Sequence, residues 1–253
     1  DVVIHCAGIV GGIEANIKSP FKFLSANLEM GLNIVNCSVE NEIMNFINLG
    51  SSCMYPKNIN TEIHESDLLK GPLEKTNEGY ALAKISIAKL CEYITNQYGY
   101  NYKTLIPCNL YGKWDNFDEF KSHMIPAAIK KIDIALKTNL KPVIWGDGSA
   151  RREFMYAEDL ADFILFALKN FNQLDCYTNV GLGHDFSVLD YYSTIAKVLG
   201  YNGDFQFDLN RPTGVSNKLC STNKINKLGW RPKFSLEEGI KETYEFYLKK
   251  YGI

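Results

Sequence analysis

A tyrosine and a lysine stand four residues apart in GYALAKISIAKLCEYITNQYG (79–99), a segment whose spacing and closing glycine predict a helix. Residues at positions i and i+4 share one face of a helix, so Tyr80 and Lys84 are expected to be neighbours. An ammonium group beside a phenol favours the phenolate, and we therefore expect a lowered pKa for Tyr80. The pair suits proton exchange with a carbonyl group, although the same spacing is common on purely structural helices.

A serine and a cysteine occur where the predicted strand IMNFINLGSS (43–52) ends, in the segment GSSCMYPK (50–57). At a turn facing the helix, the Ser51 hydroxyl can hold a carbonyl oxygen while Tyr80 exchanges a proton with it. The trio of Ser51, Tyr80 and Lys84 therefore suits hydride transfer to a ketone, with the proton supplied by the tyrosine. If the strand geometry continues, alternation puts Cys53 on the same side as Ser51.

The elements that must position these groups alternate along the first half of the chain. Patterns typical of strands occur at DVVIHCAG (1–8), 43–52 and YKTLIPCNLYG (102–112), and patterns typical of helices at 20–40 and 79–99. This alternation predicts parallel βαβ units and a doubly wound, Rossmann-type α/β sheet. Further helices are expected at 122–137, 157–169, 187–199 and 235–250, and short strands at 142–145, 176–180 and 204–207.

Two parts are expected in this organisation. Residues 1–142 form the remainder of a dinucleotide-binding domain that carries the Ser/Tyr/Lys trio, and residues 143–253 form mainly a smaller substrate-binding lobe, with some elements returning to the sheet. No G-x-G-x-x-G turn follows a first strand, although such a domain normally has one. We therefore expect that the sheet lacks its N-terminal βαβ part; a small sheet complete in itself is the alternative.

Composition argues against several classes of partner. The formal net charge of the 253 residues is −2 and no Lys/Arg cluster is present, so nucleic-acid binding is not expected. The longest apolar runs are too short to span a bilayer. The seven cysteines are scattered and include no C-x-x-C pair, which predicts neither a disulfide framework nor a metal site. We expect a reduced, cytoplasmic protein.

Ser51 together with Y-x-x-x-K at 80–84 resembles the short-chain dehydrogenase/reductase superfamily in its extended, nucleotide-sugar branch. More narrowly, the chain resembles the GDP-L-fucose synthase family through stretches that run nearly from end to end: GSSCMYPK (50–57), NEGYALAK (77–84), PCNLYG (107–112), SHMIPA (122–127), VIWGDGSARREFMYAEDLA (143–161), NVGLG (179–183) and KLGWRPKFSLEEGI (227–240). The resemblance implies NADPH-dependent 3,5-epimerisation and 4-reduction of GDP-4-keto-6-deoxy-D-mannose to GDP-L-fucose. In that family a glycine-rich first βαβ unit precedes the stretches matched here.

The resemblance also implies catalytic roles for five residues. Tyr80 is then the general acid, Lys84 its partner and a contact of the nicotinamide ribose, and Ser51 orients the C4 carbonyl. Cys53 and His123 carry out the epimerisation, in which a proton beside the ketone leaves from one face and another arrives on the opposite face. A thiol and an imidazole both exchange protons near neutral pH. The structural alternative is a small buried Cys53 and a helix-capping His123.

Cofactor contacts follow from the same resemblance. NADP(H) would contact the chain at Ala7, Gly8, Asn27, Tyr80, Lys84, Pro107, Asn109, Leu110 and His123. Asn27 is equally compatible with an ordinary polar position on an amphipathic helix. NADP rather than NAD is implied by the resemblance alone, because the residues that select the adenosine phosphate lie upstream in the family.

The GDP-linked 4-keto-6-deoxy sugar would contact the chain at Lys131, Trp145, Arg152 and Lys218. The planar fork of donors on Arg152 suits a diphosphate, and Trp145 offers an apolar face to a sugar or base. A core tryptophan and a surface arginine are the structural alternatives. Thr213 departs from the acidic residue that is common in the family, which leaves the identity of the sugar open.

Three interpretations of function stay open on the sequence. The first is the epimerase/reductase that makes GDP-L-fucose. The second is a C4 reductase of a related GDP-4-keto-6-deoxy sugar, such as a heptose, with little or no epimerisation. The third is a nucleotide-sugar-binding protein without catalysis, against which the intact Ser51, Tyr80 and Lys84 argue. By analogy with the family, we expect a homodimer formed through the predicted helices at 20–40 and 79–98.

Overall fold

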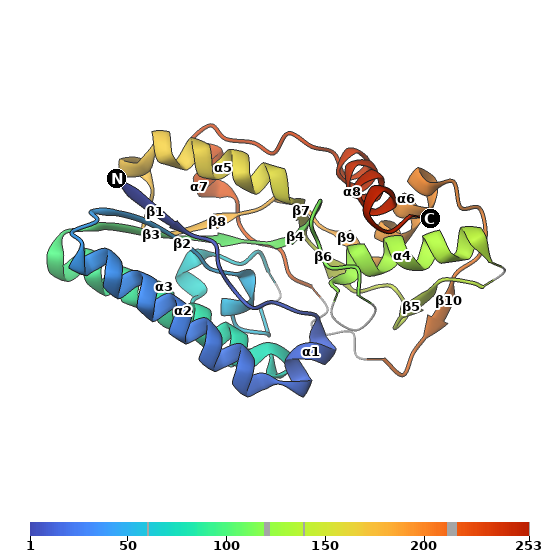
Figure 1. The fold of residues 1–253 in the computed structure, drawn as a ribbon, viewed down its shortest axis with the longest axis horizontal. Coiled ribbons are helices and arrows are strands. Elements are labelled where there is room, and N and C mark those ends of the chain that lie inside the picture. Colours follow the sequence, from blue (N-terminus) through green and yellow to red (C-terminus); the bar gives the residue numbers. More distant parts are fainter. Residues whose placement is uncertain (60, 119–121, 139, 212–216, 253) are drawn as a thin grey trace.

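The computed structural model describes residues 1–59, 61–118, 122–138, 140–211 and 217–252. Its main sheet has four parallel strands, in the spatial order β1 (Val2–His5), β2 (Asn45–Leu49), β3 (Asn101–Pro107) and β8 (Tyr177–Val180) (Figure 1). Ile47 of β2 lies opposite Ile4 of β1 and Lys103 of β3. The predicted α/β fold with a parallel sheet is therefore confirmed.

Helices cover both faces of this sheet (Figure 1): α2 (Pro20–Glu40) and α3 (Glu78–Tyr98) lie on one face, and α5 (Ala157–Lys169) and α7 (Asn223–Lys227) on the other. Successive side chains of a strand point to opposite faces. Phe46 of β2 accordingly shares a core cluster with Val35 of α2 and Ile87 of α3. Its neighbour Ile47 shares another with Phe163 of α5. Burial on both faces explains the apolar sequences of β2 and β3, whereas Val2 and Ile4 of the edge strand β1 are exposed.

The ends of the two long helices have local causes. Pro20 is the first residue of α2, where its missing N–H costs no hydrogen bond. α3 ends at Gly99, whose φ of 72° lies in the left-handed region that favours glycine. Between the helices, a side chain at Gly31 would overlap Ile87, so the close packing of α2 on α3 requires a glycine there.

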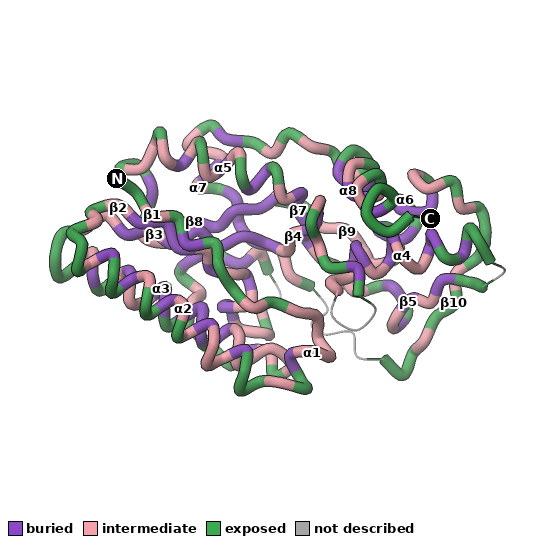
Figure 2. The backbone as a smooth tube through the Cα atoms, in the orientation of Figure 1, coloured by how far each residue is buried: buried purple, intermediate pink, exposed green. Residues whose placement is uncertain are grey.

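Burial follows the layers, as Figure 2 shows. The central strands are buried along most of their length, whereas α2 and α3 alternate between buried and exposed positions. Ala81, Lys84, Ile85, Ala88 and Cys91 are among the buried positions of α3 and recur at helical spacing. Within the described ranges, no helix is both long enough and apolar enough to cross a membrane.

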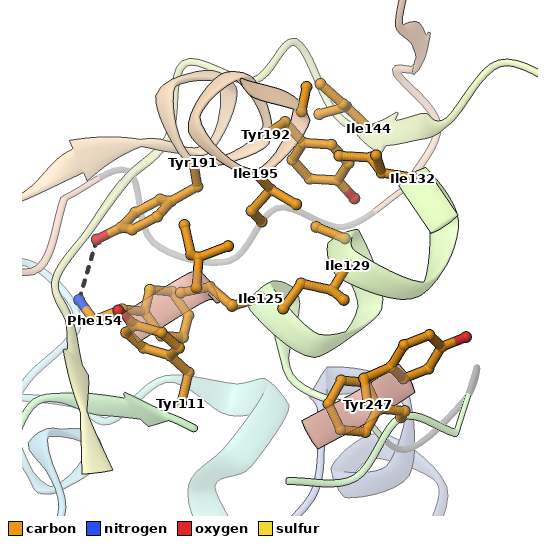
Figure 3. Close-up of a cluster of buried hydrophobic side chains, with 14 of the residues drawn as sticks. Tyr111, Ile125, Ile129, Ile132, Ile144, Phe154, Tyr191, Tyr192, Ile195 and Tyr247 are labelled. Atoms are coloured by element: carbon orange, nitrogen blue, oxygen red, sulfur yellow. Dashed lines mark hydrogen bonds between the residues drawn. The ribbon is translucent and has the colours of Figure 1, made fainter. Parts of the chain in front are cut away.

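A smaller lobe lies beside the sheet. Its core joins α4 (Met124–Lys137), α6 (Val188–Leu199) and α8 (Leu236–Tyr251), and Figure 3 shows Ile125, Ile129, Tyr191, Ile195 and Tyr247 packed together. The Tyr191 hydroxyl accepts a hydrogen bond from the Phe154 N–H (3.2 Å) at the edge of this core. Three strand pairs complete the lobe: β4 (Asn109–Tyr111) with β7 (Phe154–Tyr156), β5 (Val143–Trp145) with β10 (Gln206–Asp208), and β6 (Arg151–Arg152) with β9 (Phe186–Ser187).

The predicted helices and strands are present to within a few residues. The sequence patterns miss the short elements α1 (Ile13–Lys18), α7, β6, β7 and β9. The division of the chain at residue 142 stays a prediction. In the structure, α4 from the first part shares its core with α6 and α8 from the second. Conversely, α5, β8 and α7 of the second part belong to the main sheet and its cover.

A buried carboxylate ties separate segments together at the junction of sheet and lobe. Glu153, between β6 and β7, is only 1% exposed. Its carboxylate accepts hydrogen bonds from the N–H groups of Leu182 (2.6 Å), Gly183 (3.0 Å) and Cys220 (3.1 Å). A side chain at Gly181 would collide with it, which explains the first glycine of the NVGLG segment. Burial raises the pKa of Glu153 to about 7, although the three backbone donors act in the opposite direction.

Replacing Glu153 by glutamine is expected to destabilise the fold, because an amide cannot accept all three hydrogen bonds and an unmatched buried donor costs about 1–3 kcal/mol. A pKa raised from 4.5 to about 7 means that, between these values, the folded state binds a proton that the unfolded state releases. The contribution of Glu153 to stability therefore falls as the pH rises through this window.

The difference in free energy of unfolding between wild type and E153Q should accordingly be smaller at pH 8 than at pH 5. Urea unfolding at the two pH values measures both differences, and all other titrating groups cancel in the comparison. Equal differences at pH 5 and pH 8 would contradict a raised pKa for Glu153.

Candidate active site

A cavity of about 1060 Å³ lies between the carboxyl ends of the main strands and the smaller lobe. α/β proteins bind their ligands at this edge of the sheet. Most of the predicted site residues line the cavity: Gly8, Ser51, Cys53, Tyr80, Lys84, Pro107, Asn109, Leu110, His123, Lys131, Trp145, Arg152 and Lys218. Ala7 and Asn27 are not among the described residues that line it. The part of the chain that the structure describes contains no group of three or more His, Cys, Asp or Glu that could hold a metal ion.

The predicted trio comes together at the cavity wall, but its electrostatics differ from the prediction. Ser51 lies near enough to the Tyr80 phenol to favour its ionised form. Burial has the larger effect and raises the pKa of Tyr80. Lys84 donates to the Leu49 carbonyl (2.8 Å), and its Nζ is 5.9 Å from the centre of the Tyr80 ring. The prediction of a lowered pKa for Tyr80 is therefore wrong, because burial dominates and Lys84 is not among the groups that shift this pKa.

The turn after β2 brings Ser51 and Cys53 to the same cavity by another route than strand alternation. β2 ends at Leu49, and Ser52–Met54 form one turn of 3-10 helix. The Ser51 hydroxyl caps this turn by accepting a hydrogen bond from the Cys53 N–H (3.2 Å). The argument from strand alternation is thus wrong, although both side chains do line the cavity.

Buried hydrogen bonds hold this turn against the sheet. The Tyr55 hydroxyl donates to Asn179 Oδ1 of β8 (2.6 Å). The Asn179 side-chain amide donates to the Ile63 carbonyl (3.0 Å), and its backbone N–H donates to Glu65 Oε1 (2.9 Å). Tyr55 and Asn179 are almost fully buried. The sequence analysis misses this network, since its only local signal is a tyrosine before Pro56.

His123 is the residue immediately before α4, and its side chain makes no capping hydrogen bond to the helix. The structure therefore contradicts the alternative in which the His123 side chain caps the helix. His123 lines the cavity together with Asp115. Burial raises the pKa of Asp115, and the nearby His123 acts in the opposite direction. Asp115 is a member of the site that the sequence analysis misses.

Asn27 shapes the cavity from outside it. Its Oδ1 accepts from the Ile9 N–H (2.8 Å), and its Nδ2 donates to the carbonyls of Ile9 (3.0 Å) and Phe23 (2.7 Å). These contacts hold the Gly8–Ile9 turn, which does line the cavity at Gly8. Asn27 is thus a buried polar residue that positions a turn, and its contact with the cofactor stays a prediction.

Trp145, at the end of β5, lies between two cations. Lys131 Nζ is 5.5 Å and Arg211 Cζ 4.9 Å from the centre of an indole ring that lines the cavity. Lys131 also donates to the Val143 carbonyl (2.7 Å). Arg211 pairs with Glu14 of α1 (2.7 Å), and this contact joins the smaller lobe to the sheet side of the cavity. Arg211 is a second residue that the sequence analysis misses.

Two more basic residues line the cavity on the side of the lobe. Burial lowers the pKa of the Arg152 guanidinium, and the charge of Glu74 opposes this effect. Lys218 also lines the cavity, and its charge acts on the thiol of Cys220. Thr213, at which the sequence departs from the family, lies outside the described residues.

Comparisons with known proteins agree with this geometry. Residues 1–183 match the NAD dependent epimerase/dehydratase family. A GDP-L-colitose synthase of Yersinia pseudotuberculosis is 54% identical over 250 residues, which cover 98% of this chain and 81% of that protein. A GDP-L-fucose synthase of Azorhizobium caulinodans is 52% identical over 249 residues, which cover 98% and 80%. The chain belongs to the GDP-L-fucose synthase family of NAD-dependent epimerases and dehydratases.

This member of the GDP-L-fucose synthase family also has a fold similar to that of a solved structure. A GDP-mannoheptose C4 reductase from Campylobacter jejuni, with NADP bound, superposes with a TM-score of 0.86 at 30% identity, over 97% of this chain and 82% of that one. The resemblance drawn from the sequence motifs is confirmed for the family, and the chain is an enzyme of the GDP-sugar epimerase/reductase class. The roles of its individual residues stay predictions.

Replacing Tyr55 by phenylalanine is expected to lower the free energy of unfolding by about 1–3 kcal/mol, because Asn179 Oδ1 loses its buried donor. Turnover should fall as well, since the turn that carries Ser51 and Cys53 loses an anchor. Urea unfolding measures the first effect, and Tyr98→Phe, at a 55% exposed position on α3, is the matched control. A Tyr55→Phe protein as stable as this control would contradict the anchoring role.

Proposed function

We propose that this protein converts GDP-4-keto-6-deoxy-D-mannose to GDP-L-fucose, by 3,5-epimerisation and NADPH-dependent 4-reduction. One observation carries the proposal: the reductase residues Ser51, Tyr80 and Lys84 line the same cavity as the proton-exchanging side chains Cys53 and His123. The A. caulinodans GDP-L-fucose synthase at 52% identity supports the same product.

The sheet side of the cavity fits a nicotinamide dinucleotide. A side chain at Gly8 would stand 3.3 Å from Asn27 Oδ1 and 3.6 Å from Lys84 Nζ, so the glycine leaves this turn open for a ligand to approach the backbone. Lys84, Pro107, Asn109 and Leu110 line the adjoining wall and would hold the nicotinamide end. The NADP in the C. jejuni reductase supports this assignment. When bound, NADPH supplies the hydride for C4.

Tyr80 delivers the proton that the reduction needs at the C4 oxygen. A phenol is already neutral at neutral pH, and burial raises the pKa of Tyr80 further, so Tyr80 is in the form that can donate a proton. Ser51 and Tyr80 line the same cavity close to one another, so both hydroxyl groups can hold the carbonyl oxygen. As this oxygen gains negative charge, Tyr80 transfers its proton to it, and the ammonium of Lys84 stabilises the remaining phenolate.

Epimerisation needs a base on one face of the sugar and an acid on the other. Cys53 comes from the turn after β2 and His123 from the start of α4, so the two side chains reach the cavity from the sheet and from the lobe. One of them removes the proton beside the ketone, and the other returns a proton to the same carbon. Between these steps the negative charge rests on the C4 oxygen, which the Ser51 hydroxyl stabilises.

The nucleotide end of the substrate is assigned to the lobe side of the cavity. Lys131, Arg152 and Lys218 line it, and cationic side chains suit a diphosphate. Trp145 adds an aromatic face beside them for the sugar or the base. The surplus of positive charge at this end fits an anionic nucleotide sugar.

Two observations favour other sugars as second candidates. The Y. pseudotuberculosis relative at 54% identity is a GDP-L-colitose synthase, and colitose differs from fucose by lacking the C3 hydroxyl group. The structurally similar C. jejuni protein is a C4 reductase of a GDP-mannoheptose. The class of reaction, reduction of a GDP-linked 4-keto sugar at C4, is common to all three candidates.

Incubation with NADPH and candidate GDP-4-keto sugars in D₂O, followed by NMR of the product, tests the proposal. GDP-4-keto-6-deoxy-D-mannose should give GDP-L-fucose with deuterium at C3 and C5. Cys53→Ala should still consume NADPH but lose deuterium at these carbons, whereas Tyr80→Phe should lower the reduction rate by about 10²–10⁴-fold. Cys37→Ala, at an exposed cysteine of α2, is the matched control.

Absence of deuterium at both carbons in the wild-type product would overturn the epimerase proposal and favour the C4 reductase. A Cys53→Ala product identical to that of the wild type would exclude Cys53 as the base. Turnover only of the keto sugar without a C3 hydroxyl would favour the colitose route.

We also propose that the enzyme is a homodimer that pairs through α2 and α3. Both helices carry exposed apolar residues at positions eleven apart, which is about three helical turns and therefore one face: Phe21 (81%) and Leu32 (42%) on α2, and Leu82 (42%) and Tyr93 (57%) on α3. These faces lie away from the sheet, and a second copy would cover them.

Glutamate at both Leu32 and Leu82 is expected to convert the dimer to a monomer, because a charge within an apolar interface is left without a partner. Sedimentation equilibrium measures the mass. Leu165→Glu on α5, a 61% exposed position on the opposite face of the sheet, is the control and should stay dimeric. A wild-type mass equal to that of one chain would exclude this interface.

We assign the reaction to the cytoplasm. All seven cysteines are free thiols, as is usual in a reducing compartment.

A further inference from the structure

Asn77, the residue before α3, does not use its side chain in the way its position suggests. Asparagine is among the preferred helix N-caps, because its side-chain oxygen can accept a hydrogen bond from an N–H of the first turn. Asn77 is the N-cap of α3 but makes no such bond. Its side-chain amide instead donates to Sγ of Cys53, 24 residues earlier in the chain, at 3.1 Å.

The other end of the same amide shows that the sulfur contact orients it. Asn77 Oδ1 is buried, and among the described residues nothing donates to it. An unmatched buried acceptor is uncommon in folded proteins, and each case needs a reason. With neither a helix cap nor a partner for the oxygen, the hydrogen bond to Cys53 is the polar contact that holds the amide in place.

The Cys53 thiol lies close enough to Tyr80 of α3 and to Cys220 of the segment before α7 to act on both of these groups. Burial raises the pKa of both, so both are uncharged at neutral pH. The charged side chains that line the cavity on these elements and on the turn before α3 are Glu74, Lys84 and Lys218. Because all of them stay in place when Asn77 is changed, a comparison of variants isolates the effect of the amide.

We propose that Asn77 is a positioning residue for Cys53, whose amide N–H stabilises the thiolate that begins the epimerisation. A hydrogen bond from a neutral donor is stronger to an anion than to a neutral thiol, and it therefore favours the charged form. The thiolate then takes a proton from the carbon beside the C4 ketone, and an S–H bond forms. The electron pair of the broken C–H bond passes into the enolate, and His123 returns a proton to the opposite face. No net oxidation accompanies these steps.

This inference rests on the proposed function for the substrate and for the role of Cys53 as the base, and its first test needs neither. Alkylation by iodoacetamide follows the thiolate, so its rate on the Cys53 peptide, measured by mass spectrometry from pH 6 to pH 10, reports the thiolate fraction. In Asn77→Ala, the alkylation rate at pH 7 should fall about 3- to 10-fold, and the midpoint of its pH profile should move to higher pH. Asn77→Asp, of the same shape but acidic, should move it further.

Lys75→Ala is the matched control, because Lys75 lies on the same turn, is exposed and pairs only with Glu78 among the described residues. Its midpoint should equal that of the wild type. A midpoint that is unchanged or lower in Asn77→Ala would overturn the proposal. Since the Asn77 side chain does not cap α3, both variants should unfold at the same temperature as the wild type. If Asn77→Ala nevertheless fails to fold, Asn77→Asp still tests the proposal.

The second readout separates this inference from the proposed function. In Asn77→Ala, deuterium incorporation beside the ketone should fall with the thiolate fraction at pH 7 and recover at higher pH. If the wild type incorporates no deuterium, the proposed epimerisation fails, while the alkylation midpoints still decide the role of Asn77. If the midpoint moves but deuterium incorporation does not, Asn77 tunes the thiol without contributing to the reaction, and the positioning role is overturned.

Discussion

The buried hydrogen bond between Tyr55 and Asn179 anchors the turn on which the active site is built. The chain leaves the sheet after β2 and takes polar residues into the protein, where each polar group needs a partner. Asn179, 124 residues away on β8, receives the Tyr55 hydroxyl and in turn contacts Ile63 and Glu65. The anchored segment carries Ser51 and Cys53, so the positions of both residues depend on the buried Tyr55–Asn179 hydrogen bond.

Burial also decides the charge states at the site. Tyr80 stays protonated because its surroundings penalise the phenolate, and Lys84 is held by the Leu49 carbonyl while burial lowers its pKa. The same cause raises the pKa of Glu153 although three N–H groups point at its carboxylate. In each case desolvation outweighs the local contacts. Tyr80 is therefore protonated before a ligand arrives.

The cavity takes its lining from both the sheet and the smaller lobe. The sheet side supplies the serine, tyrosine, lysine and cysteine, whereas the smaller lobe supplies His123 and the cationic end around Trp145. Arg211 and Glu14 join the two sides by an ion pair at the cavity. An independently packed core, drawn from α4, α6 and α8, keeps the lobe in place beside the sheet. The proposed proton exchange on two faces of a sugar would use this opposition of lobe and sheet.

The sequence by itself determined the order of strands and helices, because apolar periodicity, Pro20 and Gly99 act locally. Its motifs also indicated the family and most of the residues that line the cavity. Only the tertiary structure decided that Tyr80 keeps its proton, that Asn27 holds a turn, and that Asn77 turns from its helix to the Cys53 sulfur. Arg211 and Asp115 likewise emerged only in three dimensions. These properties depend on burial and on distances between residues far apart in the chain, and no local pattern encodes either quantity.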